Sequence, residues 1–209
     1  HVDSSAASDV YKRQIQEFMI IPSNKFNFKD GLMKSVEVYT NLKSLLKEKG
    51  FSVSVGDEGG FAPNLKTSEE VLDLIILSIE RAGLIYLDDM SIALDCAASE
   101  LFSEDSYKLT GENKKFSSDE MVFYMQALVD KYEIKSVEDP FDEKDWDAWK
   151  TFTKNNNDLQ IVGDDIFVTQ EKILRKGIDS KVANSILVKL NQVGTCLLYT
   201  SPSPRDGSI

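Results

Sequence analysis

The clearest indication of the fold comes from four segments: SIALDC (residues 91–96), SVEDP (136–140), IVGDD (161–165) and ILVKLN (186–191). In each segment a short apolar run ends in a charged residue: Asp95, Glu138, Asp164 and Lys189. Short apolar runs of this kind are typical of buried strands, and the stretches between them have a helical pattern. Strands that alternate with helices predict an α/β fold with a mainly parallel sheet, either open or closed into a barrel.

The rest of the body fits the same alternation. Apolar residues recur at helical spacing from Phe28 to Lys49, and a short buried strand is expected at Phe18–Ile21. The pairs Thr67 with Glu70 and Ser117 with Glu120 form capping-box patterns ahead of two further helices. The expected elements are strands at 92–94, 134–137, 160–162 and 185–188 and helices at 143–152 and 170–176.

Composition narrows the class of protein. The chain has 209 residues, of which 42% are hydrophobic and 28% charged, a normal globular balance. Its formal net charge of -11 disfavours non-specific binding to nucleic acid or to an anionic membrane. No apolar run is long enough to predict a membrane-spanning helix.

Cysteine and histidine usage excludes several chemistries. Cys96 and Cys196 lie far apart and form no CxxC pair, which indicates a reducing, cytoplasmic setting. The only histidine is His1, at the very end of the sequence. Catalytic Ser-His-Asp or Cys-His groups and histidine-rich zinc sites are therefore not expected in this chain.

The two ends differ in character from the body. Residues 1–14 are polar and aperiodic, and residues 196–209 are rich in serine and proline. We expect both to be foreign, adaptor-like tails, with genuine flexible termini as the alternative.

Three carboxylates at successive strand ends predict a metal site. Asp95, Glu138 and Asp164 would repel one another in a pocket unless a cation neutralised them. An all-oxygen site favours magnesium, manganese or calcium over zinc. Any one of the three could equally be a helix N-cap or an ordinary acidic residue at the end of a strand, but three in series favour a functional site.

Two further features could supply acid–base chemistry. Lys189 at a strand end beside a metal would hold its proton less tightly and could act as a general base, although alone it would be read as a solvated lysine. In VGDEGGFAP (residues 55–63), Gly59 and Gly60 allow the chain to present Glu58 closely to a ligand, although a plain polar turn has the same composition. Gln16 and Glu17 carry little information on their own.

Taken together, these strings resemble one family, enolase, the phosphopyruvate hydratase of glycolysis. The matching pieces, in the family's order, are QEFMIIP, GDEGGFAPNL, IALDCAASE, SVEDPF, IVGDDIFVT and ILVKLNQVGT. They span residues 15–195, which we expect to be part of the family's C-terminal (β/α)8 TIM barrel domain. The resemblance implies a lyase that reversibly dehydrates 2-phosphoglycerate to phosphoenolpyruvate.

The resemblance also implies roles for the site residues. Asp95, Glu138 and Asp164 would bind Mg2+, and Lys189 would remove the proton next to the substrate carboxylate. Glu58 would assist departure of the hydroxyl group with Glu17 beside it, and Gln16 would contact the substrate. The family is usually a homodimer.

Several pieces typical of the family are not found in the sequence. The small N-terminal α+β domain, the histidine-bearing segment upstream and a second active-site lysine downstream have no counterpart. We therefore expect an incomplete barrel, an internal fragment with little or no hydratase activity by itself. The alternatives are an inactive piece with a structural or interaction role, another metal-dependent member of the enolase superfamily, or a calcium-binding protein; the last lacks the loop it would need.

Overall fold

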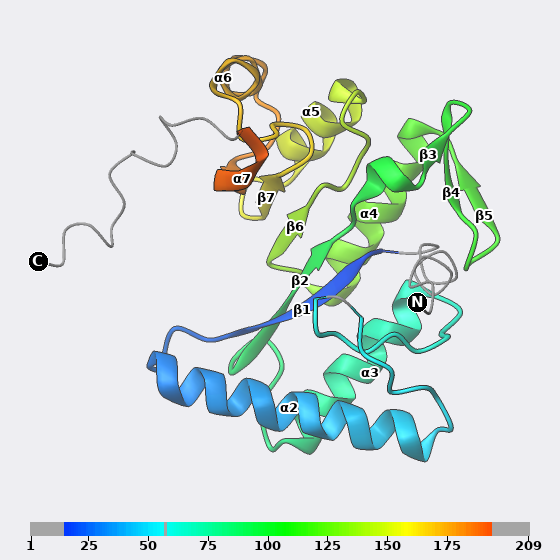
Figure 1. Ribbon diagram of the computed structural model, residues 1–209, viewed down its shortest axis with the longest axis vertical. Coiled ribbons are helices and arrows are strands. Elements are labelled where there is room, and N and C mark those ends of the chain that lie inside the picture. The colour runs from blue at the N-terminus through cyan, green and yellow to red at the C-terminus, as the bar shows by residue number, and fades with distance from the viewer. Residues whose placement is uncertain (1–14, 57, 194–209) are drawn as a thin grey trace, which may run out of the picture.

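The computed structural model describes residues 15–56 and 58–193. The tails predicted at 1–14 and 196–209, and Asp57 of the GDEGG segment, lie outside the described residues. Within them the chain forms an α/β structure with a five-stranded sheet and a separate three-stranded sheet (Figure 1). The α/β class predicted from the sequence is confirmed.

The large sheet has the order β1-β2-β6-β7-β8 and is open in the part of the chain that the structure describes. Strands β2, β6, β7 and β8 are parallel, whereas β1 pairs antiparallel with β2. The direction of β1 follows from the connection, because two successive helices lead the chain away and back to the end of the sheet where β1 stopped. The strands are β1 (Glu17–Pro22), β2 (Met90–Asp95), β6 (Ser136–Glu138), β7 (Gln160–Gly163) and β8 (Ser185–Ile186).

Six α-helices alternate with or follow these strands in the described residues. Figure 1 shows α2 and α3 together at one end of the molecule and α5 and α6 near the other. A short 3₁₀ helix, η1 (Ala98–Glu100), follows β2. The helices are α2 (Phe28–Glu48), α3 (Ser68–Arg81), α4 (Ser118–Tyr132), α5 (Trp146–Asn155), α6 (Glu171–Ser180) and α7 (Leu190–Val193).

The two predicted capping boxes differ in outcome. At α4 the Ser117 hydroxyl accepts from the Glu120 N–H, and the Glu120 carboxylate accepts from the Ser117 N–H, so the complete box is present. At α3 the Thr67 hydroxyl accepts from the Glu70 N–H at 3.1 Å, but the Glu70 carboxylate accepts from the Lys66 N–H instead. Only half of the second box therefore forms.

The small sheet was not predicted from the sequence. Its strands are β3 (Phe102–Ser103), β4 (Ser106–Leu109) and β5 (Lys114–Phe116), which are short and largely polar and so give no apolar run. Tyr107 attaches this sheet to the segment after β6. Its buried hydroxyl donates to Asp145 Oδ2 at 2.8 Å and accepts from the Asp142 N–H at 2.9 Å.

The core lies between the large sheet and its helices. Trp149 and Phe152 of α5 are fully buried, and the Phe141 ring meets both at centroid distances of 6.2 and 5.4 Å. Trp149 and Phe152 therefore pack α5 against the core. Trp146 is less enclosed, and the Lys176 ammonium group lies 3.9 Å from the centre of its ring.

Candidate active site and metal centre

The sheet register brings the predicted site residues together at one edge. Because β1 is antiparallel, its first residue, Glu17, pairs with Asp95, the last residue of β2. Asp95 in turn pairs with Glu138, the last residue of β6. Glu138 pairs with Val162, two residues before Asp164. The acidic residues at the carboxyl ends of the parallel strands therefore lie next to one another along one edge of the sheet, as is typical of α/β active sites.

Among the described residues, a group of three possible ligands contains two of the three expected metal ligands. One carboxylate oxygen each from Glu138, Asp139 and Asp164 lies within 4.8 Å of the others. Asp95 is outside this group but close enough for its charge to raise the pKa of Glu138. Asp139 was not singled out from the sequence, although the acidic pair that ends SVED is the signal that could have found it.

The pKa values of these carboxyl groups show how strongly the site disfavours negative charge. Burial raises the pKa of Asp95 to about 6, and burial with the charge of Asp95 raises the pKa of Glu138 to about 7. Burial also raises the pKa of Asp139 to about 7, against the effect of the hydrogen bonds that it accepts. At the β1 side of this sheet edge, burial and the charges of Glu58 and Asp95 raise the pKa of Glu17.

Lys189 lies against the expected metal ligand Asp164. Its Nζ donates to Asp164 Oδ2, and this hydrogen bond raises the pKa of Lys189. The sequence predicts a lowered pKa for Lys189 beside a bound cation, whereas in the metal-free chain this pKa is raised. The predicted lowering therefore applies only to a metal-bound state. A cation on Asp164 would take over part of the charge that now stabilises the ammonium group.

Two residues not predicted from the sequence fix this corner of the site. Gln192 donates from Nε2 to Asp164 Oδ1 at 2.9 Å and accepts the Thr169 hydroxyl proton at Oε1 over 2.5 Å. Thr169 Oγ1 also accepts the backbone N–H of Lys189 at 3.0 Å. Thr169 and Gln192 therefore connect the segment after β7 to the segment after β8. A threonine in a turn and a glutamine in a four-residue helix gave no signal for this role in the sequence.

The segment around Glu58 folds back on itself next to β1. The Gly56 N–H donates to the Gly60 carbonyl at 2.8 Å, and Gly59 has φ +88, a left-handed conformation that favours glycine. The Gly59 carbonyl accepts the Tyr39 hydroxyl proton at 2.9 Å. Tyr39, whose ring stacks on Phe61 at 4.3 Å, thus ties this segment to α2.

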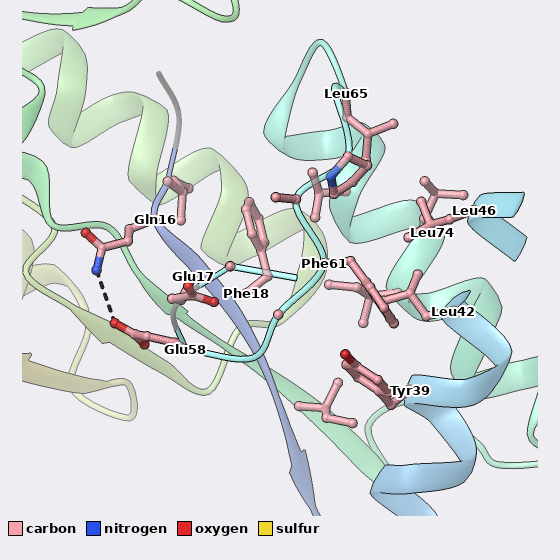
Figure 2. Close-up of a pocket in the computed structure, with 18 of the residues that line it drawn as sticks. Gln16, Glu17, Phe18, Tyr39, Leu42, Leu46, Glu58, Phe61, Leu65 and Leu74 are labelled. Carbon is pink, nitrogen blue, oxygen red and sulfur yellow. Dashed lines mark hydrogen bonds between the residues drawn. The ribbon is translucent and has the colours of Figure 1, made fainter. Parts of the chain in front are cut away.

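Glu58, Gln16 and Glu17 lie close together at the β1 side of the sheet edge. Gln16 Nε2 donates to Glu58 Oε1 at 3.4 Å, as the dashed line in Figure 2 shows. The three side chains line a cavity of about 410 Å3. Figure 2 shows them at one side of that cavity, with an apolar wall that includes Leu42, Leu46 and Leu74 at the other.

The donor set of the site fits a divalent cation. Glu138, Asp139 and Asp164 offer only oxygen atoms, which suit Mg2+ or Ca2+ better than zinc. The raised pKa values of Glu138 and Asp139 show that the surrounding fold disfavours negative charge on these two groups, which a bound cation would offset. The chain's residues are therefore compatible with a divalent metal.

These features define an α/β barrel-type sheet that carries acidic residues and a lysine at the carboxyl edge of its strands. Residues 5–199 match the family model described as the enolase C-terminal TIM barrel domain. The chain therefore belongs to the enolase family through this domain, and the open sheet is consistent with the incomplete barrel expected from the sequence. The match runs beyond residues 15–195 on both sides, so the assignment of the two ends as foreign tails stays a prediction.

The raised carboxyl pKa values predict how stability depends on pH. In the absence of metal, Asp95, Glu138 and Asp139 bind protons more tightly in the folded than in the unfolded chain. Their contribution is fully present below the unfolded pKa of about 4 and is lost as pH rises through the folded values of about 6 to 7. We expect the free energy of unfolding to fall by about 2 kcal/mol between about pH 5 and pH 8, after a discount for solvent screening.

Thermal melts with and without Mg2+ measure this effect. At about pH 8, Mg2+ at a hundred times its dissociation constant should restore about 2.7 kcal/mol, and at about pH 5 it should add much less. Glu138→Gln should flatten the metal-free pH profile. A metal-free melting temperature that rises steadily from pH 5 to pH 8 would contradict the prediction.

Proposed function

We propose that this chain carries the active-site residues of a phosphopyruvate hydratase, the Mg2+-dependent lyase that interconverts 2-phosphoglycerate and phosphoenolpyruvate in glycolysis. The supporting observation is the order of groups along the sheet edge. Glu17 and Glu58 stand at the β1 end, Lys189 follows β8, and the carboxylates Asp95, Glu138 and Asp164 lie between them.

This order suits a dehydration that needs a base and an acid on different sides of one substrate. The proton at C2 is weakly acidic because its removal adds charge next to a carboxylate. Lys189 would take that proton at Nζ. The hydroxyl at C3 is a poor leaving group until it is protonated, and Glu58 would supply that proton from the opposite side, with Glu17 beside it.

The cation has one task in this scheme. Bound Mg2+ would stabilise the negative charge that develops on the substrate carboxylate. Asp95, Glu138 and Asp164 would hold it, and Gln16 would contact the substrate near Glu58. Asp164 is buried and Asp95 and Glu138 are half-buried, which would reduce the screening of this interaction by bulk water.

The proposal extends to the oligomeric state and the location of the complete enzyme. A homodimer in the cytoplasm is the setting we infer for the complete enzyme. Among the described residues, none of the helices has the length and apolar character needed to span a membrane.

The alternative is a catalytically inactive chain with a structural or interaction role. The open sheet in the described residues, with β1 and β8 at its two edges, favours this reading, because unpaired edges invite pairing with other chains.

Two assays on the 209-residue chain test the proposal and separate it from the alternative. Calorimetry measures whether 2-phosphoglycerate binds only when Mg2+ is present, and magnetic resonance measures exchange of its C2 hydrogen with deuterated solvent. We expect Mg2+-dependent binding and exchange, with little or no overall dehydration by the chain alone. Absence of both binding and exchange would contradict the proposal and leave the inactive alternative.

A further inference from the structure

Asp139 directly follows the expected metal ligand Glu138 and has no role in the proposed reaction. The residue is 3% exposed, and its carboxylate accepts two backbone hydrogen bonds from the segment that follows β7. Oδ1 accepts from the Asp164 N–H at 3.0 Å, and Oδ2 accepts from the Asp165 N–H at 2.8 Å. One side chain thus binds the two consecutive amides at the start of the segment that carries Asp164.

The backbone of Asp139 is held from both neighbouring strands. Its N–H donates to the Val162 carbonyl at 3.0 Å, on the β7 side. Its carbonyl accepts from the Ala98 N–H at 3.1 Å, on the β2 side. The residue therefore has a fixed position between the ends of three strands.

The Asp139 carboxylate links the end of β6 to the end of β7 beyond the last paired residues of the two strands. The paired residues end at Glu138 and Val162, and Asp164 lies two residues beyond. An aspartate can serve both amides because it has two acceptor oxygens, whereas an asparagine has one. Asp139 adopts φ +40, a left-handed conformation that is unfavourable for a non-glycine residue, so the surrounding contacts must favour it.

We propose that Asp139 is a positioning residue that sets the separation of Glu138 and Asp164 and so prepares them to bind a divalent cation. This inference rests on the proposed metal site. Asp139 acts through the backbone of Asp164 and Asp165, because each of its two oxygens accepts one of those backbone hydrogen bonds. Residues that orient metal ligands in this way typically contribute 10- to 100-fold to metal affinity.

The test compares Asp139→Asn with a matched control, Asp142→Asn. Asp142 lies in the same segment and is 7% exposed, but its carboxylate accepts from the Lys144 N–H within that segment. We expect Asp139→Asn to weaken Mg2+ binding by about 10- to 100-fold in calorimetry of the full chain, and Asp142→Asn to leave it unchanged. Should Asp139→Asn fail to fold, Asp139→Glu and Asp142→Glu make the same comparison with the charge kept.

Two further measurements separate positioning from a direct ligand role or a general loss of stability. Amide hydrogen exchange in the metal-free chain should accelerate at Asp164 and Asp165 in Asp139→Asn and not at Lys144. The luminescence lifetime of bound Tb3+ in light and heavy water should report the same number of coordinated waters in variant and unaltered chain. One additional water would assign Asp139 as a ligand and overturn the inference.

The outcomes also separate this inference from the proposed function. If the unaltered chain binds Mg2+ and Asp139→Asn binds it equally well, the inference fails and the proposed function stands. If the unaltered chain binds no Mg2+ at all, the metal site of the proposed function fails and the inference fails with it.

Discussion

A chain in which Lys189 is replaced by methionine is expected to exchange the C2 hydrogen of 2-phosphoglycerate with solvent about 10²- to 10⁴-fold more slowly than the unaltered chain. Methionine keeps a long unbranched side chain but has no group that can accept the proton. In the unaltered chain, Lys189 Nζ donates to Asp164 Oδ2 at the β8 end of the proposed site. Magnetic resonance of the substrate in deuterated solvent measures the exchange.

The same substitution should not weaken Mg2+ binding, although it slows exchange of the C2 hydrogen. In the metal-free chain the Lys189 ammonium group donates to Asp164 Oδ2, where it competes with a cation for that oxygen. Lys189→Met should therefore bind Mg2+ at least as tightly as the unaltered chain. Lys172→Met, at an exposed position of α6, is the control and should change neither quantity. Exchange that persists in Lys189→Met at the unaltered rate would show that another group is the base.

The candidate site could be predicted from the sequence because its residues stand at regular strand ends. Asp95, Glu138 and Asp164 each follow a short apolar run, and parallel strands bring such ends to one edge. The antiparallel direction of β1 brings Glu17 to the same edge from the opposite end of its strand. No apolar pattern encodes that direction, because it depends on the two helices that separate β1 from β2.

The residues that the sequence did not predict act through hydrogen bonds between distant segments. Asp139, Thr169 and Gln192 connect strand ends that lie about 20 or more residues apart in the chain, and neither spacing nor composition reports such contacts. The small sheet was missed for a different reason. Its four-residue central strand alternates too briefly to distinguish it from a polar turn, although it contains the fully buried Tyr107.

Replacing Phe167 with alanine is expected to lower the free energy of unfolding by about 3–5 kcal/mol. Phe167 is 2% exposed and lies three residues after Asp164. Its ring fills the space left by two glycines, because a Cβ atom added to either Gly163 or Gly177 would come closer than 3.0 Å to it. No side chain of those glycines can fill the cavity that the alanine leaves, so both lost burial and the cavity contribute to the cost.

The same substitution should also weaken metal binding, because the ring holds the segment that carries Asp164 against α6. The Phe167 N–H donates to the Asp164 carbonyl at 3.1 Å, and the Phe167 carbonyl accepts from the Gln170 N–H at 2.8 Å. Denaturant unfolding and Mg2+ calorimetry measure the two effects, with Phe123→Ala as the control. Phe123 is 74% exposed on α4, and its loss should change stability by no more than about 0.5 kcal/mol. If Phe167→Ala were as stable as Phe123→Ala, the ring would not hold this segment in place. If Phe167→Ala lost stability but kept full Mg2+ affinity, Asp164 would be fixed by Asp139 and Gln192 alone.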